Sequence, residues 1–447
     1  MKKSRLLIAG VVATSLVILP LAYALGARRM PPGPSPTDLA LINGVIQLVE
    51  SDYVHAVDSH KLTKDALKGM LTRLDPHSDF MDEQEFKASE ADINGKFGGL
   101  GIQISEEHGV PKVISPIDGT PAAQAGLQPG DLIIGIDGAS AQGVELSKIV
   151  RLLRGTPGTS VKLTIARGND APLEVSITRA IIQVQTVKSE LKPDGIGYVR
   201  ISEFGSDTQR DFKQAVLKLK QDAGGNLKGL VLDLRNDPGG LLSAAVAVAG
   251  NFLDGGTVVT IKGRRGDDNH AFDATAGGDL IPNTPIVVLI NGASASASEI
   301  VAGALQDRHR AKVMGTQSFG KGSVQTIIPL NGYGALRLTT ALYYTPGGRS
   351  IQGQGIAPDI VVKAPKDQQV AGAFMPHEST LTGAFRNPGP LLRKLESDTK
   401  SKEGAPTQAE SYSAPIKTQI IGTPDDAQLK AALDYFEKTP SSTTGRG

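Results

Sequence analysis

The sequence of 447 residues contains no cysteine. Disulfide bonds, thiolate nucleophiles, zinc ribbons and iron–sulfur clusters are therefore excluded together. An excess of either charge is also missing, because 47 Lys and Arg residues stand against 46 Asp and Glu residues. This balance gives no electrostatic reason to expect a nucleic-acid partner, and we predict none. The length exceeds what one ordinary hydrophobic core supports, so two or three domains are expected.

The longest uncharged run of the sequence lies at the N-terminus. Residues 6–26 carry no charge and follow a basic start, KKSR, at 2–5. Together with the small-x-small tripeptide AYA at 22–24, they predict a secretory signal peptide over residues 1–24. An uncleaved membrane anchor is the alternative, because the apolar run is nearly long enough to span a bilayer. In both cases the rest of the chain leaves the cytoplasm, and the expected location is the periplasm.

A helical region is predicted over residues 37–90, after the proline-rich linker PPGPSP at 31–36. Apolar residues recur there every three or four positions, and the segment DPHS at 75–78 stops the second helix. So small a unit buries little apolar surface alone. We therefore expect it to dock on another domain or on a second copy of the chain, forming a dimer.

Residues 97–168 are predicted to form a compact β-rich module. The loop FGGLGI at 97–102 leads into an alternating strand, PAAQAGL at 121–127 predicts a short helix, and GDLIIGIDG at 130–138 predicts a strand between two turns. In this order the segments resemble a PDZ domain. The resemblance implies that backbone N–H groups of the glycine loop bind the terminal carboxylate of a peptide, which pairs as an added strand. The peptide-binding residues so implied are Gly98, Gly99, Leu100 and Gly101.

Strands and helices alternate from about residue 186 to residue 362. The apolar runs GLVLDL at 229–234 and PIVVLI at 285–290 predict strands of a sheet that is covered on both faces. The alternation predicts an α/β core with parallel strands, so the fold class is a multi-domain α/β protein. Beyond residue 363 the chain is polar, and it is rich in proline over residues 387–415. Residues 363–447 therefore predict a linker, a short helix at 425–436 and a disordered tail.

A serine-rich turn, SASASEI at 294–300, follows the second of these apolar strands. Ser296 and Glu299 have the spacing of a helix capping box, which is a purely structural explanation. The same geometry would hold a nucleophilic hydroxyl where the first helical N–H groups can stabilise a developing oxyanion. On spacing alone, Ser294 and Ser298 are alternative nucleophiles.

A nucleophilic serine needs a base, and the histidines are poor candidates. They fall in predicted helices, surface turns or the tail, and His309, the nearest to the serines, lies at a cationic helix end. A Ser-His-Asp triad is therefore the weaker alternative. The seven histidines are His55, His60, His77, His108, His270, His309 and His377.

Lys321 is the better candidate base, because two glycines flank it in an otherwise uncharged stretch. Burial beside Phe319 would lower its pKa toward the range in which the amine accepts a proton, and Ser-Lys pairs are a known variant of serine catalysis. The segment GTQSFGK at 315–321 also nearly matches a phosphate-binding loop. Gly322 stands where that loop needs Ser or Thr, and a strand follows instead of a helix, so we do not expect an ATP site.

Several strings together are similar to motifs of the C-terminal processing peptidases, also called tail-specific proteases, of peptidase family S41. They are LDPHS at 74–78, SASASEI at 294–300, ALQD at 304–307, FGKGSVQ at 319–325 and YTPGGRSIQ at 344–352. The resemblance covers about residues 37–365, with the PDZ module inserted as in the family. It implies a protease core related to the ClpP and crotonase-like folds, and a serine endopeptidase that needs no cofactor and no metal.

The resemblance also implies a role for individual residues. Ser296 would be the nucleophile and Lys321 the general base, oriented by Gln325. The backbone N–H groups of Gly240 and Ala297 would form the oxyanion hole.

Two further residues match positions of interest in the family. Arg154 would be a regulatory residue that senses docking of the PDZ domain, and Asp307 is interpreted as structural. The implied partners are proteins or peptides with apolar C-termini, a periplasmic adaptor protein, and further copies of the chain in a dimer or a larger oligomer.

Two alternative functions stay open at this point. A catalytically inactive scaffold would have the same fold and would bind tails without hydrolysing them. A crotonase-like acyl-CoA enzyme would share the βαβ units and a glycine-lined oxyanion hole. The PDZ insertion and the Ser-Lys pairing argue against the acyl-CoA enzyme.

Overall fold

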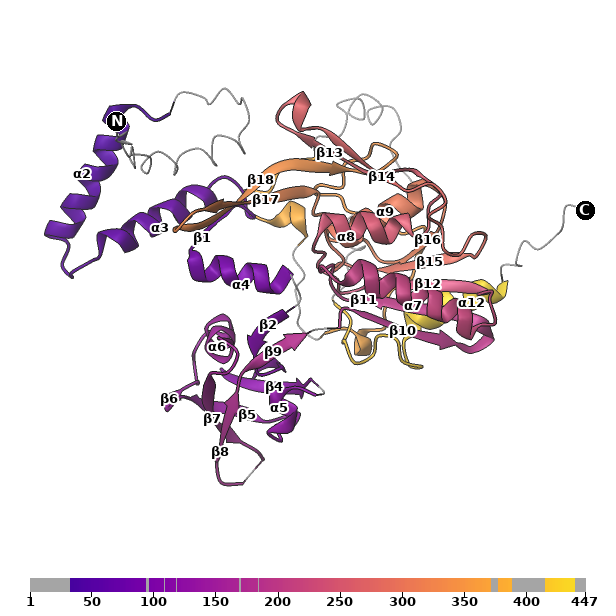
Figure 1. Ribbon diagram of the computed structural model, residues 1–447, viewed down its shortest axis with the longest axis horizontal. Coiled ribbons are helices and arrows are strands. Elements are labelled where there is room, and N and C mark those ends of the chain that lie inside the picture. The colour runs from indigo at the N-terminus through magenta and orange to yellow at the C-terminus, as the bar shows by residue number, and fades with distance from the viewer. Residues whose placement is uncertain are drawn as a thin grey trace, which may run out of the picture. The chain divides into compact units, whose positions relative to one another are not determined.

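The computed structural model divides the chain into two compact units, residues 1–67 and 68–447. The predicted signal peptide or anchor lies outside the described residues. Among the helices that are described, none is both long enough and apolar enough to cross a membrane. The structure describes residues 33–93, 96–107, 109–117, 119–168, 170–183, 185–370, 377–387 and 415–438 (Figure 1).

The first unit contains α2 (Pro36–Asp52) and the beginning of α3 (Ser59–Thr72). Ser35 caps α2, because its hydroxyl accepts from the N–H of Asp38, whose carboxylate accepts from the N–H of Ser35. No residue of α2 is buried, and Leu41 is 66% exposed. The predicted helices are therefore present, and their apolar residues are left uncovered in the single chain. Exposed apolar surface of this kind is typical of an interaction site.

The β-rich module is built around one sheet of six strands, in the order β3-β4-β5-β7-β8 with β6 beside β5. It extends past the predicted end at residue 168, because β8 (Leu173–Thr178) pairs with β7 (Ser160–Ala166). Most residues of β8 are exposed, so its sequence carries little apolar signal. The other elements are β2 (Lys96–Gly99), β3 (Ile102–Glu107), β4 (Val110–Pro116), α5 (Pro121–Gln124), β5 (Leu132–Ile136), β6 (Ala139–Ser140), α6 (Leu146–Leu153) and β9 (Ala180–Gln183).

The predicted α/β core is a second sheet of six strands, in the order β10-β11-β12-β15-β16-β19. From β11 to β19 neighbouring strands are parallel, as predicted, and only β10 is antiparallel. Every residue of β12 and of β15 is buried, so both faces of the sheet are covered. The strands are β10 (Val187–Lys192), β11 (Ile196–Ile201), β12 (Gly229–Asp233), β15 (Ile286–Ile290), β16 (Lys312–Gly315) and β19 (Ile360–Val361).

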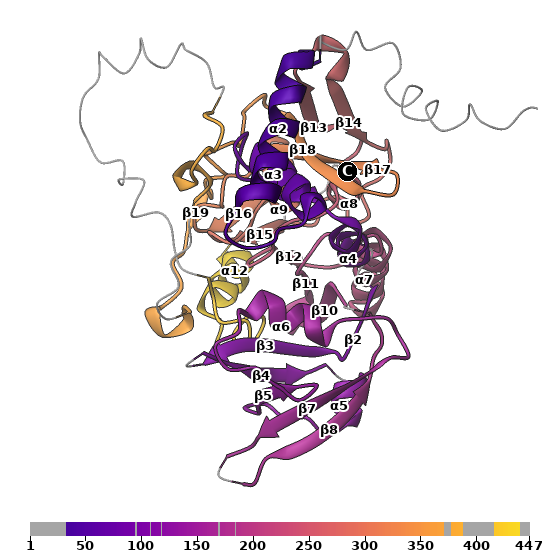
Figure 2. The same ribbon diagram turned by 90° about the vertical axis from the view of Figure 1, so that its left-hand side faces the viewer.

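Alternate residues of these strands face two different hydrophobic cores. Leu232 and Val288 pack with α7 (Thr208–Asp222), α8 (Leu242–Gly250) and α9 (Ala297–Asp307), whereas Val231 and Val287 pack with α12 (Ala427–Lys438). Figure 2 shows β11 and β12 between α7 and α12. The predicted C-terminal helix is therefore part of the core and not an appendage of a linker. Its amphipathic pattern could not show which surface it covers.

A further sheet brings together distant parts of the sequence. In it β1 (Asp79–Met81) and β17 (Ser323–Leu330) both pair with β18 (Gly334–Tyr344), which also pairs with β13 (Gly256–Gly263) and through it with β14 (His270–Ala274). The segment LDPHS at 74–78 immediately precedes β1. It is therefore held close to the strand that follows Lys321 (Figure 1).

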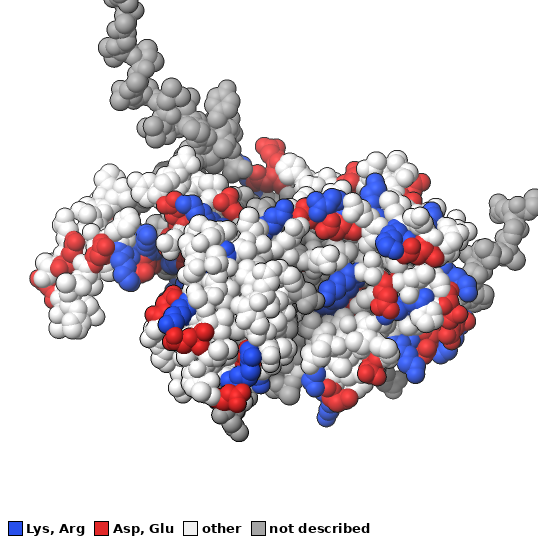
Figure 3. Space-filling model, turned by 60° about the horizontal axis from the view of Figure 1, so that its bottom comes forward, with Lys and Arg blue, Asp and Glu red and all other residues white. Residues whose placement is uncertain are grey.

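The surface shows no field of a single charge on the face drawn in Figure 3. Basic and acidic side chains are interspersed over it, as the net charge of +1 leads one to expect. Such a face offers no basic stripe that would follow a phosphate backbone.

Candidate active site

Ser296 lies in the tight turn between β15 and α9. Its backbone has a φ of +56°, which is rare for a residue other than glycine and is typical of turns that hold a functional group. Its side chain makes no cap hydrogen bond to the helix. Its N–H donates to Glu299 Oε2 at 2.8 Å, so the glutamate half of the predicted capping box is formed. Ser296 itself lines a cavity of about 1300 Å³.

The hydroxyls of the two alternative serines, Ser294 and Ser298, are engaged in hydrogen bonds to the backbone. The hydroxyl of Ser294 donates to the carbonyl of Leu234 at 2.7 Å, and that of Ser298 donates to the carbonyl of Asp237 at 3.1 Å. Both serines have no exposed surface, and neither lines the cavity that Ser296 reaches. Their hydroxyls therefore fix the turn.

The loop DPGG at 237–240 packs directly against the serine turn. The N–H of Ala295 donates to the carbonyl of Asp237 at 3.0 Å. Gly239 has a φ of +102°, and a Cβ atom there would lie within 2.9 Å of atoms of Ala295, Ser296 and Ala297. Only glycine allows this approach. The two segments predicted to form the oxyanion hole are therefore side by side.

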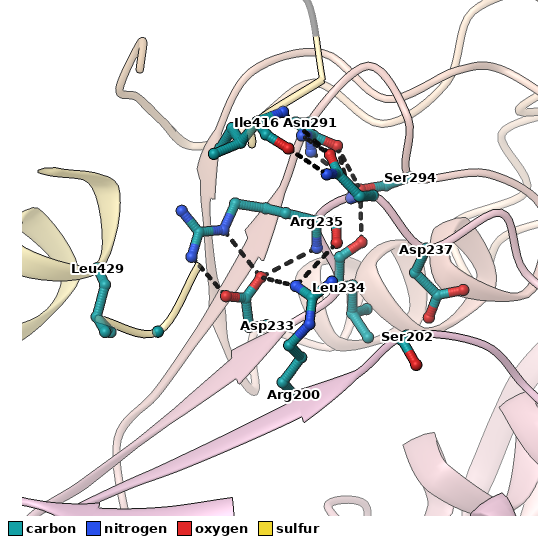
Figure 4. A network of polar contacts seen from close by, with 12 residues as sticks. Arg200, Ser202, Asp233, Leu234, Arg235, Asp237, Asn291, Ser294, Ile416 and Leu429 are labelled. Carbon is teal, nitrogen blue, oxygen red and sulfur yellow. Dashed lines mark hydrogen bonds and ion pairs between the residues drawn. The ribbon is translucent and has the colours of Figure 1, made fainter. Parts of the chain in front are cut away.

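A buried polar network joins the carboxyl ends of β12 and β15 to the C-terminal segment (Figure 4). The side chain of Asn291 donates to Asn236 Oδ1 at 2.7 Å, and that of Asn236 donates to the carbonyl of Ile416 at 2.6 Å. Arg235, which has no exposed surface, forms ion pairs with Asp233 and with Asp426, which precedes α12. The region expected to be a linker and tail thus supports the loops that carry the site.

Lys321 lies just before β17 and lines the same cavity as Ser296. Its ammonium donates to Gln325 Oε1 at 2.5 Å. Burial lowers the pKa of Lys321, and Arg337 acts in the same direction, while the charges of Glu378, Glu299 and Asp75 oppose them. The lowering of the pKa that the sequence led us to expect is therefore present.

One buried carboxylate connects the serine turn with the lysine loop. Glu299 Oε2 accepts from the N–H groups of Ser296 and Lys321, at 2.8 and 2.9 Å. Glu299 Oε1 accepts from the hydroxyl of Ser318 and the N–H of Gly320, at 2.5 and 2.6 Å. Burial raises the pKa of Glu299 to about 7 despite these four hydrogen bonds. Sequence reasoning had treated this residue only as a helix cap.

The lysine loop is also held from the other side. Glu378 has no exposed surface and accepts from the ring of His77 at 2.9 Å and from Gln352 Nε2 at 2.8 Å. Gln352 Oε1 in turn accepts from the N–H of Gly322 at 2.9 Å. Sequence reasoning missed this cluster. Its only signals were the strings at 74–78 and 344–352, whose roles no local pattern reveals.

Tyr343 is a further residue that the sequence did not point to. Tyr343 lines the same cavity as Ser296. Burial raises the pKa of Tyr343 to about 12, so the hydroxyl stays protonated. Among the described residues, no histidine lines the cavity. His309 follows the C-cap of α9 and has a φ of +53°, and His377 packs against Phe319. The geometry therefore gives no support to the Ser-His-Asp alternative.

The predicted carboxylate-binding loop, residues 98–101, leads into β3. Gly101 has a φ of +77°, and a Cβ atom there would lie 2.3 Å from the side chain of Thr120. Within the described residues β3 is an edge strand of its sheet, so its outer side can pair with an added peptide strand. Leu100 of this loop is buried in the module core. The glycine loop and the open edge have the arrangement that tail binding requires.

The remaining predicted residues have structural contacts. The guanidinium of Arg154 lies 4.3 Å from the centroid of the Phe97 ring, at the start of the β-rich module. Asp307 accepts from the N–H of Gly347 at 2.8 Å and pairs with Arg349, which agrees with a structural interpretation. In the described part of the chain, no group of three or more His, Cys, Asp or Glu side chains could hold a metal ion.

Comparison with known families and proteins agrees with this architecture. Residues 195–362 match peptidase family S41, residues 112–167 match the PDZ domain, and residues 27–85 match the activating protease CtpB N-terminal domain. The chain is 47% identical over 369 residues to a carboxy-terminal-processing protease of Bartonella bacilliformis, which covers 82% of this chain and 83% of that protein. The chain belongs to peptidase family S41.

This S41 peptidase has other relatives. It is 37% identical over 368 residues to a probable CtpA-like serine protease of Staphylococcus aureus, covering 81% of this chain and 72% of that one. Among solved structures it resembles the photosystem II D1 C-terminal processing protease, with 29% identity, a TM-score of 0.45, and coverage of 74% of this chain and 94% of that one. The S41 peptidase is thus a serine-type peptidase with a PDZ domain and an α/β core, as the resemblance predicted.

Proposed function

We propose that this S41 peptidase is an exported endopeptidase that binds the C-terminal tails of proteins in its PDZ domain and hydrolyses them with Ser296 and Lys321. The observation that carries the proposal is the shared contact with Glu299. One carboxylate oxygen accepts from the backbone N–H of both residues, and both line one cavity. A Ser-Lys pair needs its serine and its lysine on backbone segments that lie next to each other, so that the amine can reach the hydroxyl.

The chemistry would be acyl transfer. Lys321 in its neutral form takes the proton of Ser296, whose Oγ attacks the scissile carbonyl carbon. The N–H groups of Gly240 and Ala297 stabilise the oxyanion, and the leaving amine takes the proton back as the C–N bond breaks. Water, activated by the same lysine, then hydrolyses the acyl-enzyme ester. Burial of the amine favours the neutral form at the start of this sequence.

The substrate would reach Ser296 as an extended chain with an apolar side chain near the cleaved bond. The apolar residues that line the same cavity as Ser296 include Leu241, Leu242, Val246 and Phe272. An apolar wall of this kind favours aliphatic or small side chains. The signal-like N-terminus supports a periplasmic location, and the uncovered helices of the first unit support an oligomer.

The test compares Ser296→Ala and Lys321→Ala with Lys213→Ala, a matched control because Lys213 lines the same cavity. The substrate is a reporter protein with an unstructured, apolar C-terminal tail. Loss of general-base catalysis costs about 10²- to 10⁴-fold, so we expect a loss of about 1000-fold in Lys321→Ala. Ser296→Ala has no nucleophile and should lose about 10⁶-fold, and the control should change little. Circular dichroism and melting temperature check that all three are folded.

An inactive scaffold is the alternative that the same experiment separates. Fluorescence anisotropy of a labelled tail peptide measures binding independently of cleavage. If the unmodified protein binds the peptide and never cleaves the reporter, the scaffold interpretation holds. If it cleaves, and Lys321→Ala cleaves equally well, then the lysine is not the base.

A further inference from the structure

Asp75 is a buried carboxylate for which the reaction described so far has no use. It belongs to the segment LDPHS at 74–78, and only 3% of its surface is exposed. Pairing of β1 with β18, and of β18 with β17, brings it near the strand that carries Gln325. Within β17 and β18, Gln325 lies directly opposite Thr339. Asp75 is therefore close to the residue that contacts the amine of Lys321.

A continuous chain of hydrogen bonds connects Asp75 with Lys321. The hydroxyl of Thr339 donates to Asp75 Oδ1 at 3.1 Å. Gln325 Nε2 donates to Thr339 Oγ1 at 3.1 Å and to Ser323 Oγ at 3.0 Å. Gln325 Oε1 is then left for the ammonium of Lys321. Both hydrogens and the oxygen of this one amide are thereby accounted for.

The direction of this chain follows from the charge of Asp75. Burial alone would raise the pKa of Asp75, but hydrogen bonds from Ser78, His77 and Thr339 outweigh it and hold the pKa below its ordinary value. An ionised carboxylate only accepts hydrogen bonds. The Thr339 hydroxyl must therefore donate to Asp75, which leaves its lone pairs to accept from Gln325. A hydroxyl that was free to turn would tolerate either orientation of the amide.

We propose that Asp75 and Thr339 are positioning residues, which fix the orientation of the Gln325 amide and thereby aim the amine of Lys321 at Ser296. This inference rests on the proposed role of Lys321 as the base. When Gln325 Oε1 accepts one N–H of the neutral amine, the lone pair of the nitrogen is left for the serine hydroxyl. A flipped amide would present an N–H to the amine and draw that lone pair away.

The decisive variant is Thr339→Val, which keeps the β-branched shape and removes the hydroxyl. Because the amide can then flip, we expect kcat to fall about tenfold with little change in KM. Loss of the oxygen that faces the ammonium also favours the neutral amine, so the acid limb of the kcat profile should move to lower pH. The other charged groups around Lys321, which are Glu378, Glu299, Arg337 and Asp75, are unchanged in this variant.

Thr339→Ser is the matched control, because it keeps the hydroxyl and should keep both kcat and the pH profile. Asp75→Asn should change both in the same direction as Thr339→Val, since its amide can present an N–H to Thr339. Gln325→Ala tests whether the effect passes through the glutamine. In that background Thr339→Val should cause no further loss, as a double-mutant cycle would show.

Labelling of Ser296 by a fluorophosphonate probe, measured against pH, gives a readout that does not depend on substrate binding. The inference is overturned if Thr339→Val keeps the kcat and pH profile of the unmodified protein, or if it lowers kcat equally in the Gln325→Ala background. If Lys321→Ala is itself active, the proposed function has failed instead. The lysine variant thus separates the two failures.

Discussion

The serine turn (residues 291–298) and the lysine loop (residues 317–322) reach one cavity by different means. The serine turn follows a parallel strand, and its main partner is the loop DPGG at the end of the neighbouring strand. Carboxyl ends of neighbouring strands are where α/β sheets generally place their sites. The lysine loop also follows a parallel strand, β16, but it leads into β17 of the other sheet instead of into a helix. The side chains of Glu299 and Gln352 hold it, together with the backbone N–H of Glu378, which donates to the carbonyl of Phe319.

The two loops are therefore positioned in two different ways, one by the geometry of the sheet and one by contacts between segments far apart in the sequence. The position of Ser296 follows from the α/β fold, because its turn joins a strand and a helix of the core. The position of Lys321 also depends on contacts of its loop with segments that lie farther along the sequence. Perturbing the serine turn should therefore affect catalysis most, and perturbing the supports of the lysine loop should have graded effects.

The largest effect is expected from Gly239→Ala. A Cβ atom at this position would lie 2.7 to 2.9 Å from atoms of the serine turn, so the loop and the turn must separate. Gly239 precedes Gly240, the proposed oxyanion donor. Displacing such a donor costs about 10²- to 10³-fold in kcat, and we expect a loss of at least 100-fold. Steady-state kinetics on the reporter protein measures it.

Gly224→Ala is the matched control for backbone strain. Gly224 has a φ of +73°, but no atom lies within 4 Å of an added Cβ. This variant should lose about 1 kcal/mol of stability and no activity. If Gly239→Ala keeps full activity while both variants are equally destabilised, the close approach of the two loops is irrelevant to catalysis.

The same contrast explains what the sequence could predict. The strand before Ser296, the turn and the parallel order of the core follow from local apolar runs and glycines, and the structure has them as predicted. The positive φ of Ser296 has no signal in a Ser/Ala-rich string. Nor do the contacts of Gln352 and Glu378, because they join positions far apart in the sequence. α12 was predicted as a helix, but its place against the sheet depends on a buried ion pair that no pattern reveals.

A smaller effect is expected from Glu299→Gln, which weakens the connection between the two loops. Each side-chain oxygen of Glu299 accepts two hydrogen bonds. In the variant an NH₂ group replaces one of these oxygens and cannot accept the hydrogen bonds that this oxygen received. We expect kcat to fall about tenfold, because the lysine loop is then less firmly held against the serine turn. Glu437→Gln, on the exposed side of α12, is the control and should be silent.

Glu299→Gln should also change how the stability of the protein depends on pH. The pKa of Glu299 is raised to about 7 in the folded protein, against 4.5 ordinarily. The folded state thus binds this proton more tightly. The stability gained in this way is full below about pH 4.5 and is lost as the pH rises through 7, by about 3 kcal/mol. Urea unfolding from acid to neutral pH should show that the unmodified protein loses this much relative to the variant. A constant difference would contradict the assignment.

The smallest effect is expected from Gln352→Leu, which removes one support of the lysine loop and leaves Glu299 in place. The variant leaves the N–H of Gly322 without its partner, and it removes one of the two donors to Glu378 Oε1, which keeps His77. A buried polar group that loses its hydrogen-bond partner lowers the free energy of unfolding by about 1 to 3 kcal/mol, which urea unfolding measures. The kcat should fall only about threefold. Gln354→Leu, two residues away and exposed, should change neither quantity. A loss of activity as large as that of Gly239→Ala would mean that the lysine loop is fixed as rigidly as the serine turn, and the contrast between them would disappear.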